Sequence, residues 1–335
     1  MSAWWEHVLW LSAFLWCPER VLGFFILGFY LFVWLPWGLF QMIPHGWVLH
    51  MTLLVVYMVV PPMEHMAFRR WRFFKMYRAL FYPSTAIYSE HNAHRPDPAH
   101  PTLYAISPHG CYFEAGCTAF VMTSAFKHVR SLGSSVLWKV PILKELVTLV
   151  GAKPISAKEI QKQLYKDKGS ISIVPEGMRG AVARTDPHTI PIRKGFIRCA
   201  AFELSVQPSV DDKTTLSWSD VRIVPVYIQG SWTLFHTWPG AEATKANSAI
   251  RRFQHWLLST PLIACPLIWF GRWGTLLPLP EDPHNPIVLK FGAPIYCRGK
   301  TVDAIYHEYM TARMRLEELV PHTLTLLSTI EKETA

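Results

Sequence analysis

The chain has 335 residues, of which 50% are hydrophobic and 17% are charged, below the roughly 25% of an average soluble domain. Its 33 lysines and arginines outnumber 24 acidic residues, so the net charge is +9. This composition excludes an intrinsically disordered chain, a collagen-like protein and a disulfide scaffold. A basic, charge-poor chain with fifteen tryptophans fits a membrane surface better than nucleic acid.

An uncharged stretch runs from residue 21 to residue 63. Residues 21–40 provide the roughly 20 apolar residues that a helix needs to cross a bilayer, and 42–63 reach the same length. The turn-like residues 41–46 between them predict a helical hairpin with both ends on one side of the membrane. A single tilted span with a re-entrant piece, or a buried core helix, is the alternative. The run is too long for a cleaved signal peptide.

Residues 64–100 predict a basic, aromatic interfacial segment followed by a linker. Cations such as Arg70, Lys75 and Arg78 alternate with aromatic residues, which is typical of a segment in the headgroup layer on the cytosolic side. A merely solvated basic linker would explain the charges but not the aromatic residues. We therefore expect an N-terminal membrane region over 1–63, the interfacial segment and linker over 64–100, and a folded domain over 101–335.

Strand and helix patterns alternate in this last region. We expect strands over 102–107, 170–174, 221–228 and 287–291, and helices over 111–126, 156–169 and 194–204, with a last helix beginning after Thr301. Ser156 opens a capping-box pattern, and Thr301 can cap the last helix. Alternating strands and helices predict an α/β domain with a largely parallel sheet.

The first predicted strand leads directly into Ser107-Pro108-His109-Gly110, and Glu114 follows. In α/β folds substrates bind beyond the carboxyl ends of the strands. An imidazole oriented by a carboxylate can take a proton from an alcohol, so His109 and Glu114 are candidate catalytic residues. A chance histidine and glutamate on the surface would give the same spacing.

Two further blocks carry glycine and cations. Pro175-Glu176-Gly177 and Arg179 follow the strand over 170–174, and Arg193-Lys194-Gly195 lead into a helix. Glycine lets the backbone approach a ligand, and cations at a helix start favour phosphate, whereas solubility alone is the alternative. The six cysteines show no C-x-x-C pair or zinc-type spacing, so we expect no metal.

The order of these blocks is similar to that of the glycerolipid acyltransferase superfamily, whose first block is H-x-x-x-x-D. More closely, residues 100–297 resemble the type-2 diacylglycerol acyltransferase family, through PHG at 108–110, VGAKPIS at 150–156, KGF at 194–196 and GAPI at 292–295. The chain departs from that family in Ser107, where a histidine is usual, and in its P-E-G-x-R block. That block is typical of lysophospholipid and glycerol-phosphate acyltransferases, where it holds the acceptor phosphate.

The resemblance implies a membrane-bound enzyme that moves a fatty acyl group from acyl-CoA to a glycerolipid hydroxyl, converting diacylglycerol to triacylglycerol. It implies that His109 is the base and that Glu114 orients it. It also implies that substrate is bound by Pro108, Gly110, Pro175, Glu176, Gly177, Arg179, Arg193, Lys194 and Gly195. Acyl-CoA is a co-substrate, and we expect no cofactor. The expected location is the endoplasmic reticulum membrane, with the catalytic domain facing the cytosol, and lipid droplets as a second location.

The expected partners are membrane lipids, acyl-CoA and a glycerolipid acceptor, without nucleic acid, and homo-oligomerisation is left open. Two other functions remain at this point. One is a lysophospholipid or monoacylglycerol acyltransferase, which the P-E-G-x-R block favours. The other is a non-catalytic lipid-droplet or membrane lipid-binding protein, which Ser107 in place of histidine favours.

Overall fold

The computed structural model describes residues 48, 52, 64, 72–95, 97, 100–108, 120, 126–139, 143–177, 192–201, 221–238, 268–270, 279, 282, 284–320, 324–326 and 329. All but Val48 and Thr52 belong to one compact unit of the chain, Glu64–Gly271 with Leu277–Ala335. The predicted hairpin over 21–63 thus lies almost entirely outside the described residues. No helix among the described ones combines the length and apolar character that a membrane crossing requires.

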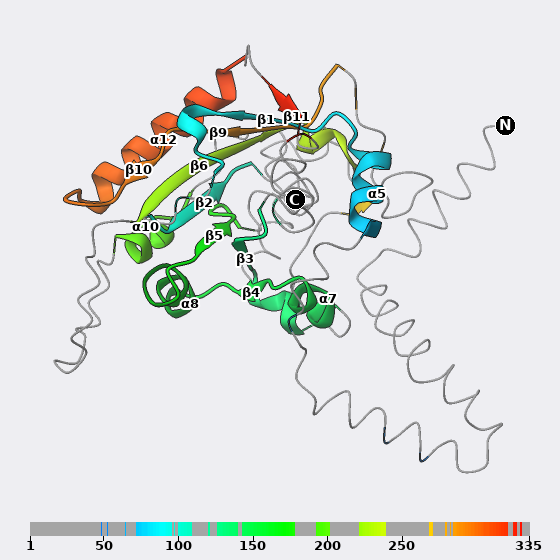
Figure 1. The fold of residues 1–335 in the computed structure, drawn as a ribbon, viewed down its shortest axis with the longest axis horizontal. Helices are drawn as coiled ribbons and strands as arrows, with labels where there is room; N and C mark the ends of the chain where they lie inside the picture. The colour runs from blue at the N-terminus through cyan, green and yellow to red at the C-terminus, as the bar shows by residue number, and fades with distance from the viewer. Residues whose placement is uncertain are drawn as a thin grey trace. The chain divides into compact units, whose positions relative to one another are not determined.

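One mixed sheet forms the centre of this unit (Figure 1). Its strands, in spatial order, are β11 (Thr325–Leu326), β1 (Ala86–Ser89), β9 (Val288–Phe291), β6 (Arg222–Gln229), β2 (Thr102–Ile106), β5 (Ser170–Ile173), β3 (Val129–Gly133) and β4 (Lys153–Pro154), and β10 (Ile295–Tyr296) also pairs with β6. A separate antiparallel pair joins β7 (His236–Trp238) to β8 (Ile268–Phe270).

Strand direction reverses between β6 and β9, near the middle of the sheet, and again between β1 and β11 at its edge. The five strands from β6 to β4 run parallel to one another, whereas β9 lies antiparallel to β6 and parallel to β1. The predicted α/β fold with a mostly parallel sheet is therefore confirmed. The reversal at β6 and β9 is not predicted, because the apolar pattern of a strand contains no information on its direction.

The helices of the described residues are α5 (Arg72–Phe81), α7 (Leu143–Leu149), α8 (Ala157–Gln161), α10 (Gly195–Ala200) and α12 (Val302–Glu318), with short helical turns at Glu90–Asn92, Ser135–Lys139, Lys162–Lys166 and Ser231–Thr233. Both predicted caps are present. Ser156 Oγ accepts a hydrogen bond from the Glu159 amide at 3.1 Å, and Thr301 Oγ1 accepts one from the Ala304 amide at 3.2 Å. These contacts satisfy amide groups that the first helical turn leaves unpaired.

The predicted strands over 102–107, 170–174, 221–228 and 287–291 are confirmed as β2, β5, β6 and β9. The predicted helices over 156–169 and 194–204 are shorter than expected, and the one over 111–126 lies largely outside the described residues. Residues 86–89, which the sequence interpretation places in the interfacial segment, form β1 within the sheet. A four-residue strand is too short to show the alternation that identifies longer strands.

Successive side chains of β2 pack into two different cores. Tyr104 lies on one face in an aromatic cluster, where its ring centroid is 6.0 Å from that of Phe291. Leu103 lies on the other face, which α10 and α12 cover with Phe196 and Tyr309 in edge contact at 5.4 Å. Because side chains alternate along a strand, a fully apolar strand is buried on both faces. All five residues of β2 are buried, as expected of a strand that is covered on both faces.

Candidate active site

The candidate active site begins where β2 and β5 end. These strands run parallel in register, with Ala105 opposite Ile173, so the residues that follow them come together. Ser107 follows β2 and is completely buried, and Glu176 follows β5 with only 3% of its surface exposed. The Ser107 hydroxyl donates a hydrogen bond to Glu176 Oε2 at 2.7 Å. Two of the predicted blocks therefore converge at one edge of the sheet.

A guanidinium from α12 completes this contact. Arg313 is 2% exposed, and its Nε donates a hydrogen bond to Ser107 Oγ at 3.1 Å. A buried carboxylate and a buried guanidinium are stable in a fold only when they are paired and hydrogen-bonded. The Ser107 hydroxyl connects the two charges, because it donates a hydrogen bond to the Glu176 carboxylate and accepts one from the Arg313 guanidinium. We call Glu176, Ser107 and Arg313 the buried polar cluster.

Tyr309 and Tyr227 lie close enough to the buried polar cluster for its charges to change their pKa values. Burial raises the pKa of Tyr309, one helical turn before Arg313, far above its ordinary value, and the guanidinium offsets part of the effect. Burial also raises the pKa of Tyr227 on β6, and the negative charge of Glu317 adds to the effect. Both phenols therefore remain protonated at physiological pH and can act there only as neutral hydrogen-bonding groups.

The predicted catalytic pair, His109 and Glu114, lies outside the described residues, as do Gly110 and Arg179. Pro108 is the last described residue before His109, and it lies buried at the carboxyl end of β2. Gly177 is described at the end of the opposite block, with a φ of +56° and open space where a Cβ would be. Pro175 lies buried beside Glu176. The contact between His109 and Glu114 remains a prediction.

The second basic block lies elsewhere along α12. Lys194 Nζ forms an ion pair with Asp303 and lies 4.9 Å from the ring centroid of Tyr306, and Arg193 is exposed. The hydrogen bond from Lys194 lowers the pKa of the Asp303 carboxyl. Asp303 and Arg313 are ten residues apart on α12, or about 15 Å along the helix. Residues 193–195 are therefore not brought together with the buried polar cluster.

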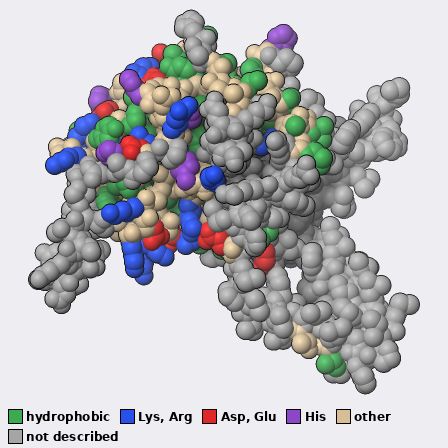
Figure 2. Space-filling view, in the orientation of Figure 1, with side chains coloured by type: hydrophobic (Ala, Val, Ile, Leu, Met, Phe, Trp, Pro, Cys, Tyr) green, Lys and Arg blue, Asp and Glu red, His purple; other side chains and the backbone are tan. Residues whose placement is uncertain are grey.

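Cations on the surface extend this second block. Lys158, Lys162 and Lys166 are exposed on α8 and the turn after it, and α8 packs against α10. Figure 2 shows lysine and arginine side chains gathering over these two elements. The arrangement provides a cationic surface beside Arg193 and Lys194, as the predicted binding of phosphate would require.

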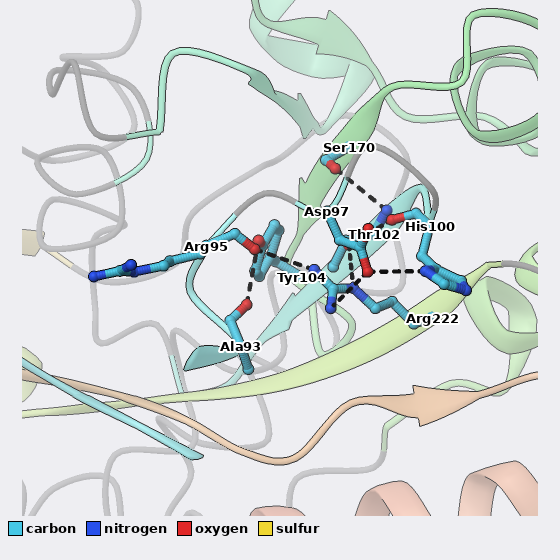
Figure 3. A network of polar contacts seen from close by, with 8 residues as sticks. All are labelled: Ala93, Arg95, Asp97, His100, Thr102, Tyr104, Ser170 and Arg222. Carbon is cyan, nitrogen blue, oxygen red and sulfur yellow. Dashed lines mark hydrogen bonds and ion pairs between the residues drawn. The ribbon is translucent and has the colours of Figure 1, made fainter. Parts of the chain in front are cut away.

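A different polar network closes the amino ends of β2 and β6 (Figure 3). Arg222 is buried, and its guanidinium donates hydrogen bonds to Thr102 Oγ1 at 2.7 Å and to the carbonyl of Arg95 at 3.1 Å. Asp97 lies 3.7 Å from the same guanidinium and 2.8 Å from the His100 ring. Arg95 and Asp97, which the sequence interpretation places in the segment over 64–100, thus contact a residue of the sheet. This network lies at the opposite end of β2 from Ser107.

Sequence reasoning missed Arg313 as a site residue. A signal for it exists in the apolar stripe of α12, because Ile305, Tyr309, Arg313 and Leu316 recur at a spacing of three or four residues. A charged residue within such a stripe has to find a buried partner. Its partner could not be identified, because Ser107 is 206 positions away in the sequence.

Comparisons with known proteins identify the family. A family model described as Diacylglycerol acyltransferase matches residues 39–320. No curated protein matches the chain. A similar solved structure is the crystal structure of the 1-acyl-sn-glycerophosphate (LPA) acyltransferase, PlsC, from Thermotoga maritima. It is 15% identical, over 93% of this chain and 96% of that one, with a TM-score of 0.40. On the family match, the chain belongs to the diacylglycerol acyltransferase family, which is a family of acyltransferases.

Proposed function

We propose that this protein transfers a fatty acyl group from acyl-CoA to the hydroxyl of diacylglycerol and so forms triacylglycerol. The family match over residues 39–320 carries the proposal. The position of Ser107 and Pro108 supports it, because they connect the carboxyl end of β2 to His109. Reacting groups of α/β enzymes typically lie at that edge of the sheet.

In the proposed mechanism, the His109 imidazole takes the proton from the acceptor hydroxyl. The alcohol oxygen then attacks the thioester carbonyl, a C–O bond forms, the C–S bond breaks, and the imidazolium returns the proton to the CoA thiolate. Glu114 orients the imidazole and stabilises its charged form. Neither role requires a metal ligand, which agrees with the cysteine and histidine spacing of the sequence.

The test of this mechanism is His109→Ala, assayed in microsomes with labelled acyl-CoA and diacylglycerol. General-base catalysis contributes about 10²–10⁴-fold, so we expect kcat to fall by that factor at normal expression. His307→Ala is the matched control, because His307 is an exposed histidine on α12. Wild-type activity in the His109 variant would reject the base assignment.

We propose a neutral acceptor rather than a phosphorylated one. In the P-E-G-x-R block, the Glu176 carboxylate already binds the Ser107 hydroxyl, so it is engaged within the protein. The family match supports diacylglycerol as the acceptor, although Arg179 of the P-E-G-x-R block would have no phosphate to hold in that lipid. We expect Arg179→Ala to leave the KM for diacylglycerol unchanged. A strongly raised KM for a lysophospholipid, together with better turnover of that acceptor by the unmodified enzyme, would favour the lysophospholipid acyltransferase instead.

We propose that Arg193, Lys194 and Gly195 lie beside the phosphates of acyl-CoA. The pantetheine arm separates the thioester of CoA from its nucleotide phosphates, so cations at a distance from the reacting carbonyl suit this donor. On binding of acyl-CoA, the Lys194 ammonium would leave its ion pair with Asp303 and pair with a phosphate of CoA instead. We expect Lys194→Ala to raise the KM for acyl-CoA but not for acyl-pantetheine, which lacks the nucleotide. An equal rise for both donors would contradict this role.

We further propose that the protein resides in the endoplasmic reticulum membrane with residues 101–335 facing the cytosol. The uncharged stretch over 21–63 and the basic segment after it support this location. Expression in a host that lacks storage lipid tests location and activity together. New triacylglycerol in that host is the expected result, and lipid droplets without new acyl transfer would favour the non-catalytic alternative.

A further inference from the structure

The buried polar cluster of Glu176, Ser107 and Arg313 joins three distant parts of the chain. Ser107 and Glu176 are 69 positions apart, and Ser107 and Arg313 are 206 positions apart. All three side chains are at most 3% exposed. The cluster therefore links the carboxyl ends of β2 and β5 to α12 without contact with bulk solvent.

The chemistry of the cluster fixes the orientation of the Ser107 hydroxyl. A serine hydroxyl has one proton and two lone pairs. The carboxylate of Glu176 can only accept, at 2.7 Å, and Nε of Arg313 can only donate, at 3.1 Å. The proton of Ser107 is consequently directed at Glu176, and a lone pair is directed at Arg313. Charge-assisted hydrogen bonds of this kind are about twice as strong as neutral ones.

The backbone of Ser107 is fixed as well. Its amide donates a hydrogen bond to the carbonyl of Val226 on β6 at 2.9 Å. Backbone and side chain together thus hold Ser107 against β6, β5 and α12. His109 follows only two residues later in the sequence. Any shift of Ser107 is therefore passed on to the start of the segment that carries the proposed base.

We propose that Arg313 is a positioning residue for acyl transfer, which acts through the hydroxyl of Ser107. The proposal rests on the proposed function. Stability alone does not require this cluster, because well-packed apolar residues of similar volume often replace a buried ion pair at little cost. What the polar cluster adds is specificity of geometry, because its hydrogen bonds allow one orientation of the Ser107 hydroxyl and one register of α12 against β2.

The test is a double-mutant cycle on kcat with Ser107→Ala and Arg313→Lys. Misplacement of a reacting group by about 1 Å can reduce the rate about 10²-fold. We expect Ser107→Ala to lower kcat about 10–100-fold with an unchanged KM, on the same argument. The double variant should fall little below the single ones, because both remove the same connection.

Ser172→Ala is the matched control. Ser172 is a buried serine on β5, 2% exposed, whose hydroxyl forms a 2.8 Å hydrogen bond with that of Ser131 on β3. The Ser172→Ala substitution removes a buried hydroxyl, as Ser107→Ala does, but leaves the buried polar cluster unchanged. We expect it to lower the melting temperature as much as Ser107→Ala does and to leave kcat unchanged.

Three outcomes decide the question. A selective loss of kcat in the Ser107 variant, with non-additive effects in the cycle, supports the proposal. Full activity of that variant per folded molecule would overturn it, even if the Arg313 variant does not fold. Strictly additive effects of the two substitutions would also overturn it. His109→Ala separates this result from the proposed function, because an active His109 variant rejects the base assignment while the cycle still reports on Ser107 and Arg313.

Discussion

At the scale of single residues, the described part of the protein buries several charged side chains, and Lys290 is one whose partners are clear. Lys290 on β9 is 1% exposed, and its ammonium donates hydrogen bonds to the carbonyls of Leu316 at 3.1 Å and Leu319 at 2.6 Å. These carbonyls belong to the last turn of α12 and the residue after it. A cation at this end also favours the helix dipole. Lys290 therefore holds the end of the helix that carries Arg313.

Replacement of Lys290 by methionine should destabilise the fold by about 1–3 kcal/mol, because two carbonyl groups lose their buried donor. Lys300→Met is the control, since Lys300 forms an exposed ion pair with Glu308 whose loss costs less than about 1 kcal/mol. Equilibrium urea unfolding of both variants measures the difference. Equal losses would show that the carbonyls find other partners.

A pH dependence follows from Cys297, which is buried beside β10. Burial raises the pKa of its thiol from 9.0 to about 12. Between these values the unfolded chain has lost the thiol proton while the folded protein retains it, so stability falls as the pH rises. We expect the free energy of unfolding to fall above pH 9, and by about 1.4 kcal/mol less per pH unit in Cys297→Ala. Parallel slopes in denaturation at pH 8, 9 and 10 would contradict this.

At the scale of elements, the sequence predicts best where a local signal is strong. β2 and β6 are buried strands in which most residues are apolar, and the caps at Ser156 and Thr301 fix the starts of two helices. The sequence predicts poorly where the signal is short or non-local. β1 is four residues long, and the antiparallel contact between β6 and β9 depends on the path of the whole chain.

The turn after β6 provides a prediction at this scale. Gly230 has a φ of +79°, and a Cβ built there would lie 2.8 Å from the carbonyl oxygen of Pro286. Gly299 has a φ of +68° but open space around its Cβ position. Alanine at either position incurs left-handed strain of about 1–2 kcal/mol. We expect Gly230→Ala to cost about 1–3 kcal/mol more than Gly299→Ala, because the clash is with backbone that has to move.

Thermal unfolding of the two glycine variants measures this difference directly. Similar melting temperatures would mean that the segment around Pro286 moves aside freely. In that case the close approach of Gly230 to Asn285 and Pro286 would contribute little to the stability of the sheet.

At the scale of the whole molecule, α5 exposes two large apolar side chains, and we predict that they contact lipid. Met76 and Leu80, one turn apart, are 63% and 62% exposed, whereas Arg78 and Phe81 on the same helix are buried. The sequence interpretation places Arg78 among the lipid headgroups, but in the structure its side chain is buried. We expect a polarity-sensitive dye at Met76→Cys to shift to the blue in anionic vesicles. The same dye at Met314→Cys, 49% exposed on α12, is the control, and identical spectra would contradict the prediction.

The candidate site was predictable in part. The blocks around Pro108 and Glu176 could be placed at the carboxyl ends of two strands, and the structure brings them together. The roles of Ser107 and Arg313 could not be predicted, because a hydrogen bond between residues 206 positions apart leaves no local pattern. The separation of Lys194 from this site also depends on how α10 and α12 pack.

The separation of 206 positions between Ser107 and Arg313 has a consequence for biosynthesis. A ribosome that has released residues 102–229 has already supplied β2, β5 and β6, yet the guanidinium that Ser107 needs is still untranslated. Until α12 emerges, the Glu176 carboxylate has to stay hydrated or meet another cation. A nascent chain that stalls before position 313 would therefore contain most of the sheet but lack the guanidinium that completes the buried polar cluster.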